Sequence, residues 1–142
     1  MVKLRTKRPA LPQLGWKEDV FLPELHNTAL VAKVDTGARL SALHADDIIM
    51  RGSRVSFRID GSRHVKKLWD TKRVKSSNGL SELRPVIETV VILGDTRFLA
   101  AITLTNRTDM GVPMLLGREA IKGRFLVNPG RMFILSKKAH RP

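Results

Sequence analysis

An acidic residue, Asp35, ends the apolar run from Ala29 to Val34 and is followed at once by Thr36, Gly37 and Ala38. A carboxylate in this position can cap the amide groups of an ordinary turn. It can also act as an acid or base on a water molecule, because a carboxyl group both accepts and donates a proton. These residues are compatible both with a structural turn and with a catalytic carboxylate, and only the rest of the sequence can distinguish the two interpretations.

A second short string, Met114 to Glu119, places two leucines directly before Gly117 and Arg118. Aspartic peptidases carry Asp-Thr-Gly after an apolar strand, and retropepsins carry such an apolar-apolar-Gly-Arg string later in the chain. Longer strings make the similarity closer: Leu22 to Leu25, Ala32 to Arg39, Ser41 to Ala45, Val74 to Gly79, Thr103 to Arg107 and Met114 to Glu119. From about Gly15 to Leu135, the chain resembles the retropepsin-like family often labelled ATP-dependent zinc proteases, which is associated with RimK-type ATP-grasp ligases that add glutamate to proteins.

The resemblance implies that Asp35 is the catalytic residue. The residues implied to support its loop are Thr36, Gly37, Ala38, Gly117 and Arg118. The Thr36 hydroxyl would hydrogen-bond across a symmetric interface, and Gly37 would permit backbone dihedrals and a close approach that a Cβ hinders. Gly117 would let the chain pass beneath the catalytic loop and enter a short helix.

An aspartic peptidase needs two carboxyls that share one proton, one acting as the base on water and the other donating to the scissile carbonyl. The chain contains a single Asp-Thr-Gly. We therefore expect a homodimer in which Asp35 of each subunit meets its mate across a two-fold axis.

The segment from Lys72 to Arg84 is the candidate flap over the substrate. Its turn-forming residues are Ser76, Ser77, Asn78 and Gly79, which are small and polar as a mobile lid requires. Arg73, Lys75 and Arg84 would give the lid positive charge. A plain surface hairpin is the equally open alternative.

The strand pattern predicts an all-β fold, because short alternating or β-branched runs are separated by tight turn signals. Predicted strands are Ala29 to Val34, Val55 to Ile59, His64 to Trp69, Pro85 to Leu93, Arg97 to Thr105, and Phe125 to Val127 paired with Arg131 to Leu135. Helical signals are confined to Ser41 to Met50, as a helix or turn, and Arg118 to Lys122. We expect a closed retropepsin-like β-barrel with one short C-terminal helix.

The chain has 142 residues, 42% of them hydrophobic, which suits one domain. We expect the barrel over residues 15–136, between basic tails at 1–14 and 137–142. The absence of cysteine excludes disulfides and thiolate ligands. No apolar run is long enough to span a membrane, and Met1 to Gln13 lacks the apolar core of a signal peptide. We expect a soluble, cytoplasmic protein.

Neither zinc nor ATP is supported by the residues, in spite of the family label. There is no His-Glu-x-x-His and no phosphate-binding glycine motif. His44 with Asp46 or Asp47 is the sole candidate metal cluster. We therefore expect no metal and no cofactor, and any ATP dependence would come from a partner such as the ATP-grasp ligase.

The formal net charge of +13 favours an anionic partner. As a peptidase, the protein would favour an acidic substrate, such as a glutamate-rich tail. The alternative is a catalytically silent binding module for an acidic protein or RNA, although Trp16, Trp69 and five phenylalanines leave few aromatics for base stacking.

Overall fold

A computed structural model describes residues 10–75 and 78–136 of the chain, which are mainly strands. The strands are β1 (Gln13–Gly15), β2 (Lys17–Val20), β3 (Leu30–Val34), β4 (Ser41–His44), β5 (Asp46–Arg51), β6 (Arg54–Ile59), β7 (Ser62–Lys67), β8 (Asp70–Lys75), β9 (Ser81–Leu93), β10 (Thr96–Thr105), β11 (Met114–Leu116) and β12 (Leu126–Asn128). The described helices are a 3₁₀ turn, η1 (Thr108–Met110), and α1 (Arg118–Ile121). The expected all-β class with a short helix near the C-terminus is therefore confirmed.

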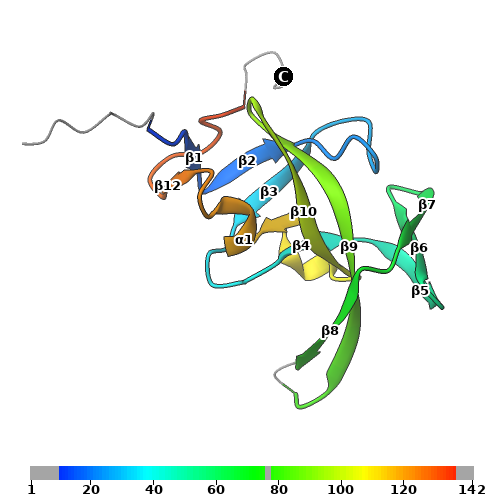
Figure 1. The fold of residues 1–142 in the computed structure, drawn as a ribbon. Coiled ribbons are helices and arrows are strands. Elements are labelled where there is room, and N and C mark those ends of the chain that lie inside the picture. The colour runs from blue at the N-terminus through cyan, green and yellow to red at the C-terminus, as the bar shows by residue number, and fades with distance from the viewer. Residues whose placement is uncertain (1–9, 76–77, 137–142) are drawn as a thin grey trace, which may run out of the picture.

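Seven strands form the main sheet in the order β2-β3-β11-β4-β10-β9-β8. The sheet curls round a core that includes Leu43, Ile87, Ile102 and Leu104, all fully buried (Figure 1). Just beyond β2, Phe21 exchanges two backbone hydrogen bonds with Ile92 of β9, each 2.9 Å long. Because this contact is a single bridge and no ladder, the closed barrel stays a prediction.

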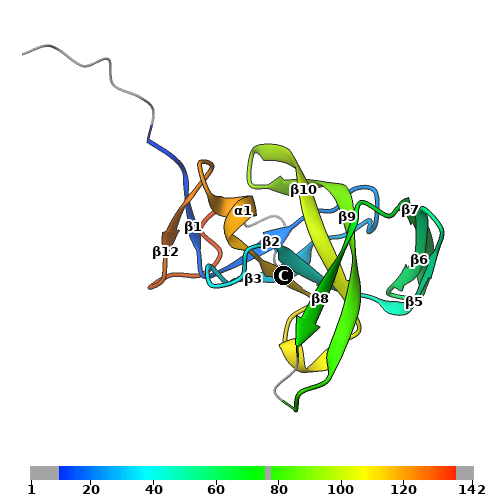
Figure 2. The same cartoon turned by 60° about the horizontal axis from the view of Figure 1, so that its bottom comes forward.

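Two smaller sheets lie at opposite ends of the molecule (Figures 1 and 2). One is the parallel pair β1–β12, and the other is the antiparallel sheet β5-β6-β7. The second sheet turns sharply between β6 and β7 at Asp60 and Gly61, whose φ values are 47° and 81°. Both values are positive, as the two central residues of a type I′ hairpin turn require.

Three sequence expectations are revised by the tertiary contacts. The segment from Ser41 to Met50 forms strands β4 and β5, because β4 is inserted between β10 and β11. Phe125 to Leu135 does not fold as a hairpin: β12 pairs with the distant β1, and residues 131–136 form no strand. Gln13 and Leu14, which lie in the segment expected to be tail, belong to β1, and Leu14 is fully buried.

The segment after β12 is held instead by Glu18, a fully buried carboxylate on β2. Its oxygens accept hydrogen bonds from the amides of Gly15 at 2.7 Å, Ile134 at 2.8 Å, and Leu135 and Ser136 at 3.2 Å. The Ser136 hydroxyl also donates to Glu18 at 3.0 Å. A buried charge is tolerated when it is surrounded by donors in this way.

Candidate active site

Asp35 lies one residue beyond the end of β3 and is half-buried. Its amide donates to the carbonyl of Leu116 at 2.8 Å, which extends the parallel pairing of β3 with β11 by one step. The backbone of Asp35 is therefore positioned by the main sheet, while its partly exposed side chain lies just past the end of strand β3.

The residues after Asp35 form a tight turn closed by its own carboxylate. The Gly37 amide donates to Asp35 Oδ1 at 3.2 Å, and the Ala38 amide donates to the Asp35 carbonyl at 3.2 Å. The other carboxylate oxygen, Oδ2, has no hydrogen-bond partner in the part of the chain that the structure describes. The Asp35 carboxylate is thus oriented by a contact to one oxygen, while the other oxygen makes no hydrogen bond within the described residues.

Two of the loop residues differ from what the sequence suggested. Gly37 does not adopt a positive φ, so the expected need for unusual dihedrals is wrong. A Cβ at Gly37 would stand 3.4 Å from Asp35 Oδ1, which is ordinary contact within one subunit. Thr36 is exposed, and within residues 10–75 and 78–136 its hydroxyl has no hydrogen-bond partner. The described contacts of a single chain therefore do not account for these two residue types.

Gly117 lies directly beneath the loop. A Cβ built there would stand 2.3 Å from the carbonyl carbon of Leu40 and 2.7 Å from the Ser41 amide nitrogen, distances that real Cβ atoms essentially never show. The Gly117 amide donates to the buried Ser41 hydroxyl at 3.0 Å. Close backbone crossing, and not backbone conformation, is why glycine stands at this position.

The first turn of α1 is tied to the same loop. The Arg118 amide donates to the Ala38 carbonyl at 2.7 Å, and the Arg118 guanidinium donates to the Thr36 carbonyl at 3.0 Å. Glu119 contacts Arg39 in the same two ways. The Glu119 amide donates to the Arg39 carbonyl at 3.0 Å, and the Arg39 guanidinium pairs with the Glu119 carboxylate at 2.9 Å. The loop therefore rests on α1, although more than 75 residues separate them in the sequence.

The candidate flap is a hairpin made by β8 and β9, in which Lys72 is paired with Arg84 and Lys75 with Ser81. Both strands belong to the main sheet, and the far end of the hairpin projects beyond the rest of that sheet in both views (Figures 1 and 2). Asn78 and Gly79 lie exposed in its turn, where Gly79 has a φ of 84°. Ser76 and Ser77 lie outside the described residues.

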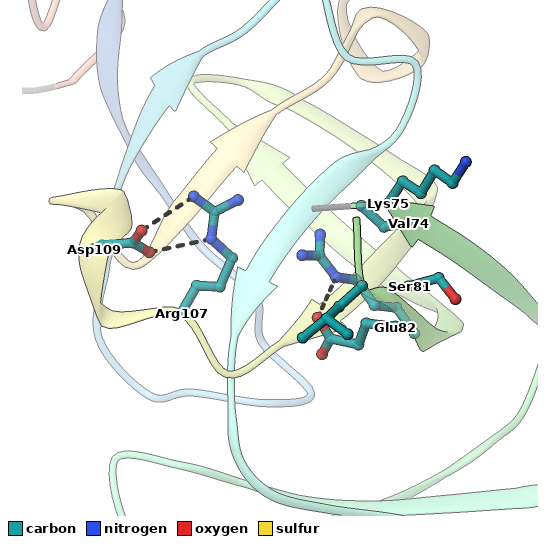
Figure 3. A pocket seen from close by; sticks show the side chains of 8 residues that line it. Val74, Lys75, Ser81, Glu82, Arg107 and Asp109 are labelled. Carbon is teal, nitrogen blue, oxygen red and sulfur yellow. Dashed lines mark hydrogen bonds and ion pairs between the residues drawn. The ribbon is translucent and has the colours of Figure 1, made fainter. Parts of the chain in front are cut away.

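A pocket of about 630 Å³ lies between this hairpin and the loop that carries η1 (Figure 3). The residues on the hairpin side are Val74, Lys75, Leu80, Ser81, Glu82 and Arg84. Across the pocket, Arg107 pairs with Asp109 at 3.1 Å, and its hydrogen bond lowers the pKa of that carboxyl. Arg84 pairs with Glu82 at 3.4 Å.

The pocket and Asp35 lie near opposite ends of β11. The η1 loop precedes Met114, whereas Asp35 bonds to Leu116. β11 has three residues, and at about 3.3 Å per residue it is about 10 Å long. A few residues of an extended peptide would cover this length. The sequence alone did not mark Arg107 and Asp109, because no spacing signal links them to the flap.

The residues around His44 do not fit a zinc ion. His44 Nδ1 accepts the Arg107 amide proton at 3.1 Å, so its Nε2 carries the proton and faces Asp46 at 3.4 Å. Asp47 is engaged by Arg58 and Arg63. Within the described ranges, no three histidine or acidic side chains converge as metal ligands would. Among the same residues, no helix is long and apolar enough to cross a membrane.

Comparison with known proteins agrees with this geometry. Residues 13–138 match the family described as "Retropepsin-like aspartic endopeptidase RimB". The chain belongs to this RimB-like family. A crystal structure of a protein of unknown function from Legionella pneumophila is similar, with a TM-score of 0.71, 28% identity, and coverage of 88% of this chain and 98% of that one.

Curated relatives carry a different name. A protein of Shewanella pealeana called "Probable alpha-L-glutamate ligase" is 42% identical over 137 residues, and one of Shewanella halifaxensis with the same name is 40% identical. The matched region covers 88% of this chain but 30% of each relative. The chain therefore spans less than a third of the curated relatives that it matches.

Proposed function

We propose that the protein is an aspartic-type endopeptidase that works as a homodimer. The observation that carries the proposal is the Asp35 loop, in which one carboxylate oxygen is held by Gly37 and the other is available. Membership of the RimB-like family supports the same chemistry.

A single Asp35 supplies half of the required machinery. In the dimer, the Asp35 carboxyls of the two subunits share one proton, because two ionised carboxylates at hydrogen-bonding distance repel each other. The ionised carboxylate takes a proton from water, and the resulting hydroxide adds to the scissile carbonyl carbon. The protonated carboxyl gives its proton to the carbonyl oxygen, which yields a tetrahedral diol. When this intermediate collapses, the carboxyl that took the proton from water gives it to the leaving nitrogen, and the other carboxylate takes back a proton from a diol hydroxyl, so that the amine and the acid are released.

An acidic substrate, such as a glutamate-rich protein tail, fits the charge of the flap. Lys75 has no acidic partner among the described residues, and Glu82 and Asp109 are 57% and 75% exposed. A substrate carboxylate can replace these exposed acids beside Arg84 and Arg107. The names of the curated relatives support an association with a glutamate ligase.

The test is hydrolysis of a synthetic peptide that ends in a run of glutamates, followed by mass spectrometry. Asp35→Asn should lower the rate by roughly a thousandfold or more, as expected for loss of an essential group. The variant should stay folded, because an asparagine oxygen can still accept the Gly37 amide. Equal hydrolysis by the variant would contradict the proposal.

A second candidate is a binding module without catalysis. The relatives favour it, because a region like this chain accompanies a protein named as a ligase. A chain that forms dimers, binds glutamate-rich peptides and cleaves none across a broad peptide library would support this candidate.

A further inference from the structure

The three-stranded sheet β5-β6-β7 has one buried and one exposed face. Val55, Phe57 and Ile59 of β6 are at most 4% exposed and join the core. The intervening residues point the opposite way, because side chains alternate along a strand. We call this opposite side the satellite face, and its members are Ile49, Arg51, Arg54, Ser56, Arg58, Arg63, Val65 and Lys67.

The register aligns three cations across the satellite face. Arg54 lies opposite Arg51 of β5 and opposite Lys67 of β7. Like charges directly opposite one another destabilise a sheet. Within the described part of the chain, none of the three forms an ion pair with an acid. The fold thus contains a repulsive row that an anion would relieve.

An apolar row lies next to the cationic row. Ile49 is opposite Ser56, and Ser56 is opposite Val65. Ile49 and Val65 are 38% and 57% exposed. Together with Arg51 and Arg54, these residues line a hollow of about 330 Å³. An aliphatic side chain would therefore find a site beside the three cations.

The next row along the strands is already neutralised. Arg58 lies opposite Arg63, and both contact the Asp47 carboxylate. Arg63 also donates to the Ser56 hydroxyl at 2.5 Å. The unpaired charge is therefore confined to one end of the satellite face.

From this arrangement we propose that the satellite face is a docking surface for an extended acidic peptide segment of a partner or substrate protein, distinct from the Asp35 site. One carboxylate of the segment pairs with the row of Arg51, Arg54 and Lys67. An aliphatic side chain two residues away enters the hollow, because alternate residues of an extended peptide repeat at about 6.6 Å, as the rows do.

A peptide fits this surface better than a nucleic acid. Single-stranded nucleic acids bind through bases stacked on aromatic side chains as well as through cations. The eight members of the satellite face include no aromatic residue. The combination of cations with aliphatic side chains matches a segment in which acidic and aliphatic residues alternate.

The test uses a fluorescein-labelled peptide, Gly-Glu-Ser-Leu-Ser-Glu-Gly, and fluorescence anisotropy with the full chain carrying Asp35→Asn. This background prevents cleavage, so docking is measured independently of the proposed peptidase activity. Arg54→Gln should weaken binding about fivefold to tenfold through loss of a charge-assisted contact. Val65→Ser should weaken binding of this peptide and have little effect on a peptide with serine in place of leucine.

Arg97→Gln is the matched control, because it removes an arginine that is also exposed but lies on β10. It should leave binding within about twofold, the change expected from net charge alone. Arg54→Gln should melt no lower than the parent, since it removes repulsion. Equal weakening by both arginine variants, no peptide binding at low salt, or displacement of the peptide by an equal concentration of a uridine oligonucleotide would overturn the proposal.

Discussion

At the scale of single residues, Gly117 lies where its own segment crosses the backbone of Leu40 and Ser41 at close range. Gly117→Ala would place a Cβ 2.4 Å from the Leu40 carbonyl oxygen, and backbone atoms would have to move. We expect a loss of about 1–3 kcal/mol in the free energy of unfolding, as for other overpacked sites. Chemical denaturation measures this loss.

Gly130→Ala is the control, because its Cβ would stand 3.4 Å from the Asn128 side chain, at ordinary contact distance. It should change stability by less than about 0.5 kcal/mol. If Gly117→Ala and Gly130→Ala lowered the free energy of unfolding equally, the close backbone crossing would not explain why glycine is needed at position 117.

His26 provides a pH-dependent contact between two loops. Its ring bonds to the Thr28 carbonyl at 2.8 Å and to the Asp60 carboxylate at 2.6 Å. The Thr28 carbonyl first, and then Asp60, raise the pKa of His26 above the ordinary value of 6.5, and burial opposes them. Because the pKa is higher in the folded state, protonated His26 stabilises the fold. This contribution to the free energy of unfolding is fully present below the unfolded-state pKa and is lost as the pH rises through the raised folded-state pKa.

His26→Gln should therefore destabilise the protein more at about pH 6 than at about pH 8, by about 0.5 kcal/mol. Thermal melting at the two pH values checks this. Asp60→Asn should remove part of the pH dependence while keeping the turn, because asparagine tolerates a positive φ. A difference between wild type and His26→Gln that grows with pH would contradict the assignment.

At the scale of elements, Glu18 attaches the segment of residues 134–136 to β2. Glu18→Gln would replace one acceptor oxygen with an NH₂ group that faces the donors of this segment. We expect a loss of about 2–4 kcal/mol, because buried donors are left unsatisfied. Hydrogen exchange should show that the amides of Ile134 and Leu135 lose protection first.

Glu82→Gln is the matched control on the flap, where the side chain is 57% exposed. It should leave both stability and exchange near Ile134 unchanged. Unchanged protection of Ile134 in Glu18→Gln would show that packing alone holds the segment.

At the scale of the whole molecule, the proposed two-carboxyl mechanism requires a second copy of the chain, because one chain supplies one Asp-Thr-Gly. We expect sedimentation across a range of protein concentrations to show a dimer, because each subunit supplies one of the two carboxyls that the mechanism needs. Asp35→Asn should still form the dimer, because asparagine can keep the Gly37 contact, and should lack hydrolysis. A monomer at every concentration would remove the two-carboxyl mechanism.

The sequence by itself determined the features that depend on neighbouring residues. The Asp-Thr-Gly turn, the Asp60-Gly61 hairpin and the alternation of β6 are set by a few consecutive side chains and their backbone preferences. Resemblance, and not spacing, linked Gly117 to the Asp35 loop, because that contact joins segments far apart in the chain.

Only the tertiary structure decided the long-range pairings. Beta-strand signals do not specify partners, so β12 could not be assigned to β1, nor could Glu18 be recognised as the anchor of residues 134–136. The sequence does not distinguish one cation from another between Arg51 and Lys67, but the pairing does. Lys66 binds Glu24, Arg58 and Arg63 contact Asp47, and Arg54 lies between two cations. Which charges are neutralised depends on strand register, and register is set by burial of one face of each strand in the folded core.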